Sequence, residues 1–133
     1  MGFDVEMTDK EWKSRLDPAR YEVLRRAATE PAFSGSLLDV HDDGSFVCGG
    51  CGQVLFASDA KFDSGCGWPS FDRAIEGTVL ERSDRSLWMR RTEILCSQCG
   101  GHLGHVFEDG PTETHLRYCV NSLAIDFEPT SEG

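Results

Sequence analysis

The six cysteines are the residues of this 133-residue chain with the greatest capacity for chemistry. Four of them form two C-x-x-C pairs, Cys48 with Cys51 and Cys96 with Cys99. The other two, Cys66 and Cys119, have no such neighbour. Thiolates either bind soft metal ions or act as nucleophiles, and spacing helps to distinguish the two uses. The paired and the single cysteines therefore need separate explanations.

The two C-x-x-C pairs are typical of a structural zinc site. Each pair lies at or just past the end of a strand-like run, and two such turns supply the four thiolates of a tetrahedral site. Because residues 52–95 separate the pairs, the metal would join two distant parts of the chain. The prediction is one Zn²⁺ per chain, bound by Cys48, Cys51, Cys96 and Cys99.

Two other uses of these cysteines agree less well with the sequence. A thioredoxin-like dithiol usually opens a helix in a βαβ unit, and neither pair has that context. A metal site built from the second pair with His102 and His105 would leave the first pair without a role, and the gap from Cys99 to His102 is too short for a finger-type loop.

Cys119 lies in the run LRYCVNS, residues 116–122. Alternation along a strand places Arg117, Cys119 and Asn121 on one face and apolar residues on the other. A nearby guanidinium lowers the pKa of a thiol from its usual value of about 8.5, which increases the share of nucleophilic thiolate. The run therefore fits a reactive thiol, although an isolated cysteine is more often a small buried apolar side chain.

Two further runs carry residues suited to thiol chemistry. In SGCGWPSF, residues 64–71, glycines on both sides of Cys66 would let the backbone move if this sulfur must meet another, and Trp68 follows. In HLGHVFEDG, residues 102–110, an imidazole of His102 or His105 could transfer a proton while Asp109 orients it. Each residue alone has an ordinary structural explanation, but together they favour a thiol enzyme.

Charge and composition exclude several classes of function. The chain has 13 Lys plus Arg against 23 Asp plus Glu, a formal net charge of -10, which repels nucleic acid and anionic lipid. No run of 18 apolar residues and no signal-peptide pattern is present in the sequence. We therefore expect a cytoplasmic protein without a nucleic-acid or membrane partner, in which cysteines serve metal or thiol chemistry.

The elements that must position these residues follow two patterns. Thr8 and Glu11 form a capping-box pattern for a helix to about Leu16, and Asp17 with Pro18 begins a second helix that continues to residues 30–31. Short strand-like runs follow, at residues 36–40, 45–48, 53–58, 78–83, 87–95, 105–109 and 117–127. We expect a single domain over residues 1–133, with its core at about 8–128 and frayed ends that include a polar tail at 129–133.

The motifs, in this order, closely resemble those of the methionine-R-sulfoxide reductases of the zinc-containing, two-cysteine type. The resemblance rests on the two C-x-x-C pairs, SGCGWPSF, HLGHVFEDGP and LRYCVNS, and extends from about Trp12 to Phe127. It implies a mainly β fold of two antiparallel β-sheets with short N-terminal helices, stapled by a four-cysteine zinc site. His115, where glycine is frequent, and Trp88, where many relatives are small, depart from the family pattern.

The resemblance also implies an activity. Such enzymes reduce the R epimer of methionine sulfoxide, mainly in proteins, and thioredoxin regenerates them. Cys119 matches the nucleophile that becomes a sulfenic acid, and Cys66 matches the resolving cysteine that forms a disulfide with it. Trp68 matches the aromatic residue that packs on the substrate methyl group. The matching polar residues of the active site are His102, His105, Asp109, Arg117 and Asn121.

Two alternatives remain on the sequence alone. One is a zinc-stabilised peptide-binding module in which Cys119 is inert. The other is a general protein dithiol oxidoreductase, which the missing βαβ pattern disfavours. We expect a monomer whose partners are an oxidised protein or peptide substrate and thioredoxin.

Overall fold

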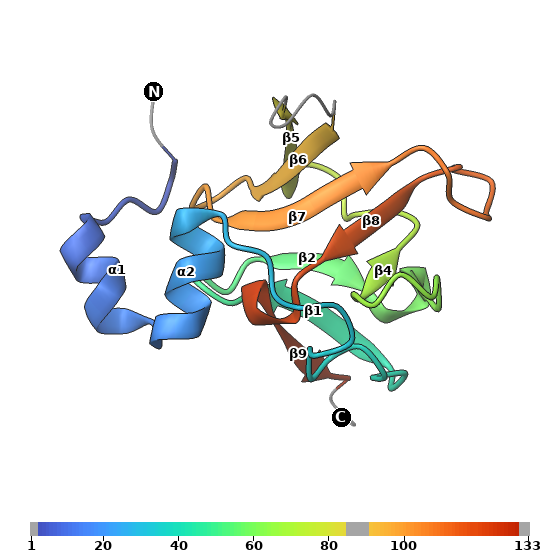
Figure 1. The fold of residues 1–133 in the computed structure, drawn as a ribbon, viewed down its shortest axis with the longest axis horizontal. Helices are drawn as coiled ribbons and strands as arrows, with labels where there is room; N and C mark the ends of the chain where they lie inside the picture. Colours follow the sequence, from blue (N-terminus) through green and yellow to red (C-terminus); the bar gives the residue numbers. More distant parts are fainter. Residues whose placement is uncertain (1–2, 85–90, 131–133) are drawn as a thin grey trace.

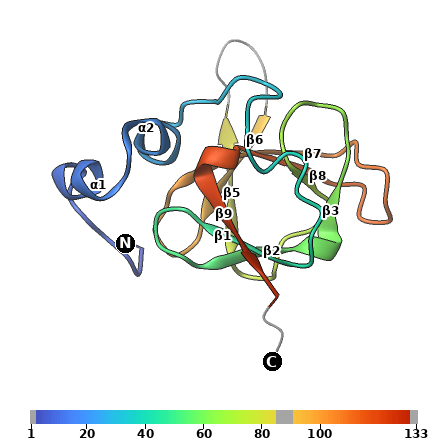
Figure 2. The same cartoon turned by 90° about the horizontal axis from the view of Figure 1, so that it is seen from below.

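The computed structural model describes residues 3–84 and 91–130 of the chain. Two short helices, α1 (Asp9–Arg15) and α2 (Pro18–Arg26), lie at one side of two antiparallel β-sheets (Figure 1, Figure 2). The predicted fold class, mainly β with short N-terminal helices, is confirmed. No helix within the described ranges is long and apolar enough to cross a membrane.

The two sheets contain nine strands of the described chain. The smaller sheet has the order β2-β1-β9 and consists of β1 (Gly44–Cys48), β2 (Val54–Ala57) and β9 (Ile125–Pro129). The larger sheet has the order β3-β4-β8-β7-β6-β5. Its strands are β3 (Lys61–Phe62), β4 (Ser70–Phe71), β5 (Val79–Asp84), β6 (Arg91–Cys96), β7 (His102–Phe107) and β8 (Arg117–Val120). Thus β8 is late in the sequence but central in its sheet.

An aromatic core joins the two sheets. Phe46 and Phe56 come from the smaller sheet, and Phe71 and Tyr118 come from the larger one. The rings of Phe56 and Phe71 stack with centroids 4.2 Å apart, and Phe46 meets Phe71 edge-on at 5.0 Å. Such pairs add roughly 0.5–1.5 kcal/mol each beyond the burial of their area. The core therefore fixes β8, which carries Cys119, and its neighbour β4.

Both helices begin as the sequence predicts. Thr8 and Glu11 form a complete capping box, and the Asp17 side chain accepts a hydrogen bond from the backbone of Arg20. The prediction for the end of α2 is wrong, because the helix stops at Arg26 and Ala27 adopts the left-handed conformation with φ 59°. Residues 28–31 form no regular secondary structure, and Glu30 instead bonds to Asn121 and Trp68, which flank strands of the larger sheet.

Residues 36–40 do not form the predicted strand. Their backbone forms turns, with Leu38 N donating to Gly35 O at 3.4 Å and Val40 N to Leu37 O at 3.3 Å. A hairpin partner would have to be β1, but β1 already pairs with β2 on one edge and β9 on the other. The apolar side chains of this segment pack against the core, but its backbone forms no β-ladder with another strand of the described chain.

The run 117–127 is not one strand, as predicted, but two. β8 ends at Val120, a 3₁₀ turn follows at Ser122–Ala124, and β9 then joins the other sheet. β7 begins at His102, three residues before the predicted start, and ends at Phe107 rather than residue 109. Of the run 87–95, residues 87–90, with Trp88, lie outside the described part.

Backbone contacts extend beyond the predicted core of residues 8–128 at both ends. Thr130 N donates to Asp43 O at 2.9 Å, and Pro129 is the last residue of β9. At the other end, Val5 N donates to Gln98 O at 2.9 Å, so ordered contacts begin before residue 8. Residues 131–133 lie outside the described part.

Candidate active site

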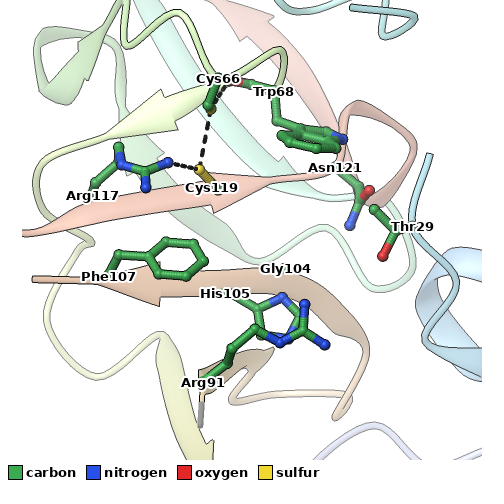
Figure 3. A pocket seen from close by; sticks show the side chains of 10 residues that line it. All are labelled: Thr29, Cys66, Trp68, Arg91, Gly104, His105, Phe107, Arg117, Cys119 and Asn121. Carbon is green, nitrogen blue, oxygen red and sulfur yellow. Dashed lines mark hydrogen bonds between the residues drawn. The ribbon is translucent and has the colours of Figure 1, made fainter. Parts of the chain in front are cut away.

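Cys66 and Cys119 lie side by side at β8, in the middle of the larger sheet. Cys119 belongs to β8, whose neighbour β4 places Ser70 directly opposite it. The loop before β4 carries Cys66, and the two sulfur atoms are 3.2 Å apart (Figure 3). The two single cysteines of the sequence therefore form a close pair, and one thiol can donate a hydrogen bond to the other.

The loop of Cys66 has a backbone that favours glycine. Gly65 and Gly67 have φ of 77° and 96°, a region that other residues adopt at a cost. A side chain at position 67 would also meet Ala32 at 2.6 Å. The loop is further fixed by Ser64, whose hydroxyl accepts from the backbone of Cys66 and contacts its sulfur at 3.0 Å. These features hold the Cys66 sulfur toward β8.

Arg117 places a fixed positive charge beside Cys119. Its Nη1 lies 2.8 Å from the Cys119 sulfur. The same guanidinium forms a bidentate pair with Asp109, at 2.8 and 3.0 Å, and stacks over the Phe107 ring at 4.7 Å. Hydrogen bonding to Arg117 holds the pKa of Asp109 below its usual range. Asp109 therefore reaches the thiol only through Arg117.

The two thiols differ in acidity because of their surroundings. Burial and the neighbouring Cys66 together raise the pKa of Cys119 to about 12, although Arg117 opposes them. Burial would also raise the pKa of Cys66, but its hydrogen bonds with Ser64, with Ser70 and with the Trp68 carbonyl, which accepts from the Cys66 thiol, outweigh it, and that pKa is lowered to about 7. With the sulfurs in contact, the first negative charge of the pair therefore resides on Cys66.

A cavity of about 290 Å³ opens over these sulfurs. Its aromatic walls are Trp68 and Phe107, and the Trp68 indole donates to the carbonyl of Glu30 at 3.0 Å. In Figure 3, Arg117 and Trp68 lie on opposite sides of the two sulfurs. The remaining lining residues are Thr29, Arg91, Gly104, His105 and Asn121. The cavity thus combines apolar walls with a few polar groups, as small-molecule sites do.

The two histidines of the HLGHVFEDG run occupy different positions. His105 lines the cavity and is the cross-strand partner of Cys119. His102 is 5% exposed and does not line it. Instead, Nδ1 of His102 lies 2.6 Å from a carboxylate oxygen of Glu93, and its ring lies edge-on to His105 with centroids 5.6 Å apart. His102 therefore does not reach the cavity itself but packs against His105, which lines it.

Asn121 lines the cavity, but its side-chain amide is bonded to the backbone. Its Oδ1 accepts from Glu30 N at 2.9 Å, and its Nδ2 donates to Leu103 O at 3.0 Å. Glu30 also accepts a bond from Leu123 N on its buried carboxylate. Asn121 and Trp68 are thus both attached to Glu30, which explains why the chain after α2 leaves the helix.

The four paired cysteines converge elsewhere, at the ends of β1 and β6. Their sulfurs all lie within 4.8 Å of one another, with Cys48 to Cys99 at 3.7 Å and Cys51 to Cys96 at 3.5 Å. A tetrahedral ion with Zn–S bonds of about 2.3 Å would require sulfurs about 3.8 Å apart, so the set fits such an ion. The prediction that these four residues can hold a metal is confirmed.

The same type of backbone hydrogen bond closes each of the two C-x-x-C turns. Gly52 N donates to Cys48 O at 2.9 Å, and Gly100 N donates to Cys96 O at 2.8 Å. Arg25 of α2 donates to Cys99 O at 3.0 Å. Since β1 and β6 belong to different sheets, the cluster connects the two sheets at the side covered by the helices.

Comparison with known proteins agrees with these observations. The model of the SelR domain matches residues 16–129. The chain belongs to the SelR domain family. The resemblance found in the motifs is thereby confirmed.

Full-length relatives of this SelR domain are named peptide methionine sulfoxide reductase MsrB. One from Leptospira interrogans is 52% identical over 129 residues, which cover 96% of this chain and 98% of the relative. Another, from Bradyrhizobium diazoefficiens, is 57% identical over 126 residues and covers 94% and 91%. A crystal structure of the Mis18 'Yippee-like' domain has a TM-score of 0.55 and 19% identity over 68% of this chain and 100% of its own. That last likeness concerns the fold alone.

Sequence reasoning missed several groups of the SelR domain site. Phe107 lies two residues after His105, so strand alternation alone could have placed both on the cavity face. Thr29, Arg91 and Glu93 carry no such signal, because their positions depend on tertiary packing and on strand register.

Proposed function

We propose that this SelR domain reduces the R epimer of methionine sulfoxide, mainly in oxidised proteins and peptides, to methionine. The observation that carries the proposal is the Cys119 sulfur, 3.2 Å from Cys66 and 2.8 Å from Arg117, in a cavity with aromatic walls. The names of the full-length relatives support the substrate class.

The reaction uses each of the two thiols once. The Cys119 thiolate attacks the partly positive sulfoxide sulfur while the oxygen takes a proton. The oxygen is then transferred from the substrate sulfur to the Cys119 sulfur: a new S–O bond forms on Cys119 while the S–O bond to the substrate and the S–S contact made in the attack break. Methionine leaves with the electron pair on its sulfur, and Cys119 is left as a sulfenic acid. The Cys66 thiol then attacks that sulfur, which forms the disulfide and releases water. Exchange with a dithiol, for which we propose thioredoxin, restores both thiols and leaves the reductant as a disulfide.

Arg117 has two tasks in this sequence. Its charge favours the thiolate of Cys119, and its bidentate pair with Asp109 fixes the guanidinium. A bound sulfoxide displaces the Cys66 sulfur from Cys119 and so removes a cause of the raised pKa. Burial is then the main remaining cause that raises the pKa of Cys119, and Arg117 lowers it. Substrate entry therefore activates the nucleophile.

His105 is the proton donor in this proposal. It lines the cavity and is opposite Cys119 in the β7–β8 register, whereas His102 lies behind it. Trp68 and Phe107 provide the apolar surface for the substrate methyl group, and the fixed donors on the other side distinguish one epimer from the other. Asn121 contributes by holding the cavity wall.

The four-cysteine cluster binds structural zinc in this proposal. Thiolate ligands in a tetrahedral set favour zinc over harder ions such as magnesium. Cys48, Cys51, Cys96 and Cys99 would hold the ion between the two sheets, away from the cavity. The metal therefore stabilises the fold and takes no part in the reduction.

The remaining proposals concern the protein as a whole. We propose a monomeric single domain that acts in the cytoplasm. The match of the family model to residues 16–129 supports the domain assignment.

One experiment tests the function directly. Turnover coupled to thioredoxin is measured on each resolved epimer of a methionine sulfoxide peptide, with zinc content determined on the same sample. The R form should be consumed and the S form should survive. Consumption of the S form instead would overturn the assignment, and an inert Cys119 with bound peptide would favour a binding module.

A further inference from the structure

Glu93 of β6 is a buried carboxylate between two basic side chains from the neighbouring strands. Its Oε1 accepts from Nε and Nη2 of Arg82 on β5, at 3.0 and 2.8 Å. Its Oε2 lies 2.6 Å from Nδ1 of His102 on β7. Glu93 is 7% exposed, so its charge requires such partners. Both carboxylate oxygens of Glu93 therefore have a basic hydrogen-bond partner.

This contact decides which nitrogen of His102 carries hydrogen. A carboxylate only accepts, so Nδ1 is the donor. Burial lowers the pKa of His102; Glu93 opposes this, while His105 and Arg82 add to it. His102 is therefore neutral near pH 7, with its lone pair on Nε2. That atom is buried and accepts no hydrogen bond from any residue in the described ranges.

A bulge in β7 brings His102 and His105 to the same side of the sheet. Residues three apart on a regular strand point to opposite faces. Here Ile94 pairs with Gly104 but Leu95 pairs with His102, so β7 contains one extra residue. The two imidazole rings consequently meet edge-on at 5.6 Å, with an angle of 71° between their planes. His102 thus contacts both Glu93 and His105, the histidine of the cavity, and Glu93 is also the cross-strand partner of His105.

We propose that Glu93 is a positioning residue for the reduction: it holds His102 in its Nδ1–H tautomer, and His102 in turn orients His105 toward the cavity. The proposal rests on the proposed function. The proton for the sulfoxide oxygen comes from His105, and His102 moves no proton. In this tautomer the buried Nε2 carries a lone pair, whereas the other tautomer would place there an N–H without an acceptor among the described residues.

The Glu93→Gln variant tests this role. An amide can donate to His102 as well as accept, so the tautomer is no longer fixed. We expect kcat to fall about 10- to 100-fold with little change in KM, by analogy with the loss of the carboxylate that supports a metal-binding histidine. Glu93→Asp should recover part of the loss. Glu81→Gln, on the exposed face of β5, removes the same charge and should leave kcat unchanged.

Two readouts separate positioning from a structural role. Nitrogen NMR of the imidazoles should show His102 with hydrogen on Nδ1 in the wild type and a mixture of tautomers in Glu93→Gln. Alkylation of Cys119 should be the same in both, because Arg117 and not Glu93 contacts that sulfur.

Three results would overturn or separate the two proposals. Wild-type kcat in Glu93→Gln overturns the positioning role. If that variant does not fold, the wild-type spectrum still decides, because hydrogen on Nε2 of His102 is incompatible with the proposal. A wild type that reduces neither epimer overturns the proposed function itself and, with it, the catalytic part of this inference.

Discussion

The sulfur of Cys66 lies 3.2 Å from the sulfur of Cys119. A disulfide bond is about 2.05 Å long, so the sulfurs need to approach by only about 1 Å to form one. The sequence left open how far the Cys66 loop must travel. For the closing step, small rotations of the two side chains are sufficient, and Gly65 and Gly67 shape the loop rather than permit a long movement.

The two thiols should respond differently to pH. The pKa of Cys66 is lowered to about 7 and its side chain is half-buried, whereas that of Cys119 is raised to about 12. Thiolate forms as pH rises, so Cys66 should be alkylated first, at a rate that is half-maximal near pH 7. Mass spectrometry after pulses of iodoacetamide measures this. Faster labelling of Cys119 than of Cys66 would contradict it.

Removal of Cys66 should activate its partner. In Cys66→Ser, the contributions of Cys66 to the raised pKa of Cys119 disappear and Arg117 remains. The alkylation rate of Cys119 should therefore rise at neutral pH relative to the wild type. A further Arg117→Met change should reverse the gain, which identifies the guanidinium as its source.

Cys66→Ser should also stop the catalytic cycle after one step. We expect about one equivalent of sulfoxide to be reduced, after which Cys119 accumulates as sulfenic acid that a dimedone probe can label. Cys119→Ser should reduce none. Normal cycling of Cys66→Ser with thioredoxin would show that another cysteine resolves the intermediate.

Loss of the four-sulfur cluster should destabilise the whole fold. The cluster joins β1 to β6 and thereby one sheet to the other. In Cys48→Ser, zinc content should fall and the melting temperature should drop by about 10 °C or more, given the large binding energies of structural zinc sites. Elemental analysis and calorimetry measure both. Retention of metal and melting temperature would disprove the site.

His115→Gly should stabilise the protein. His115 is exposed and has φ 59°, a conformation that glycine adopts without steric cost. We expect a gain of up to about 1 kcal/mol, since relief of the left-handed strain is partly offset by glycine's larger unfolded-state entropy. His115→Ala is the control, because it removes the imidazole and keeps the strain. An equal gain in both variants would exclude the backbone explanation.

The reactive residues of the site were easier to predict than the residues that hold them in place. The cysteine pairs, Arg117 and His105 lie in short runs whose residue types limit their use. Glu93 is an ordinary charged residue in a strand, and its link to His102 depends on a bulge in the pairing of β6 with β7. Such a bulge has no clear pattern in one sequence.

The elements that were predicted wrongly are those determined by distant partners. The residues after Arg26 are compatible with a longer α2. Instead, Glu30 N donates to the Asn121 side chain and Glu30 O accepts from the Trp68 indole, which requires the chain to leave the helix. Residues 36–40 have the apolar character of a strand, yet both edges of β1 are occupied. Local propensity cannot reveal competition of this kind.

The central place of β8 determines when activity can first arise during synthesis. This strand inserts between β4 and β7, and β9 then completes the smaller sheet beside β1. A nascent chain that stops before residue 117 has Cys66 and the four clustered cysteines, but neither Cys119, the proposed nucleophile, nor the strand that joins the halves of its larger sheet. Interrupted translation should therefore yield aggregation-prone fragments with exposed thiols and no repair activity.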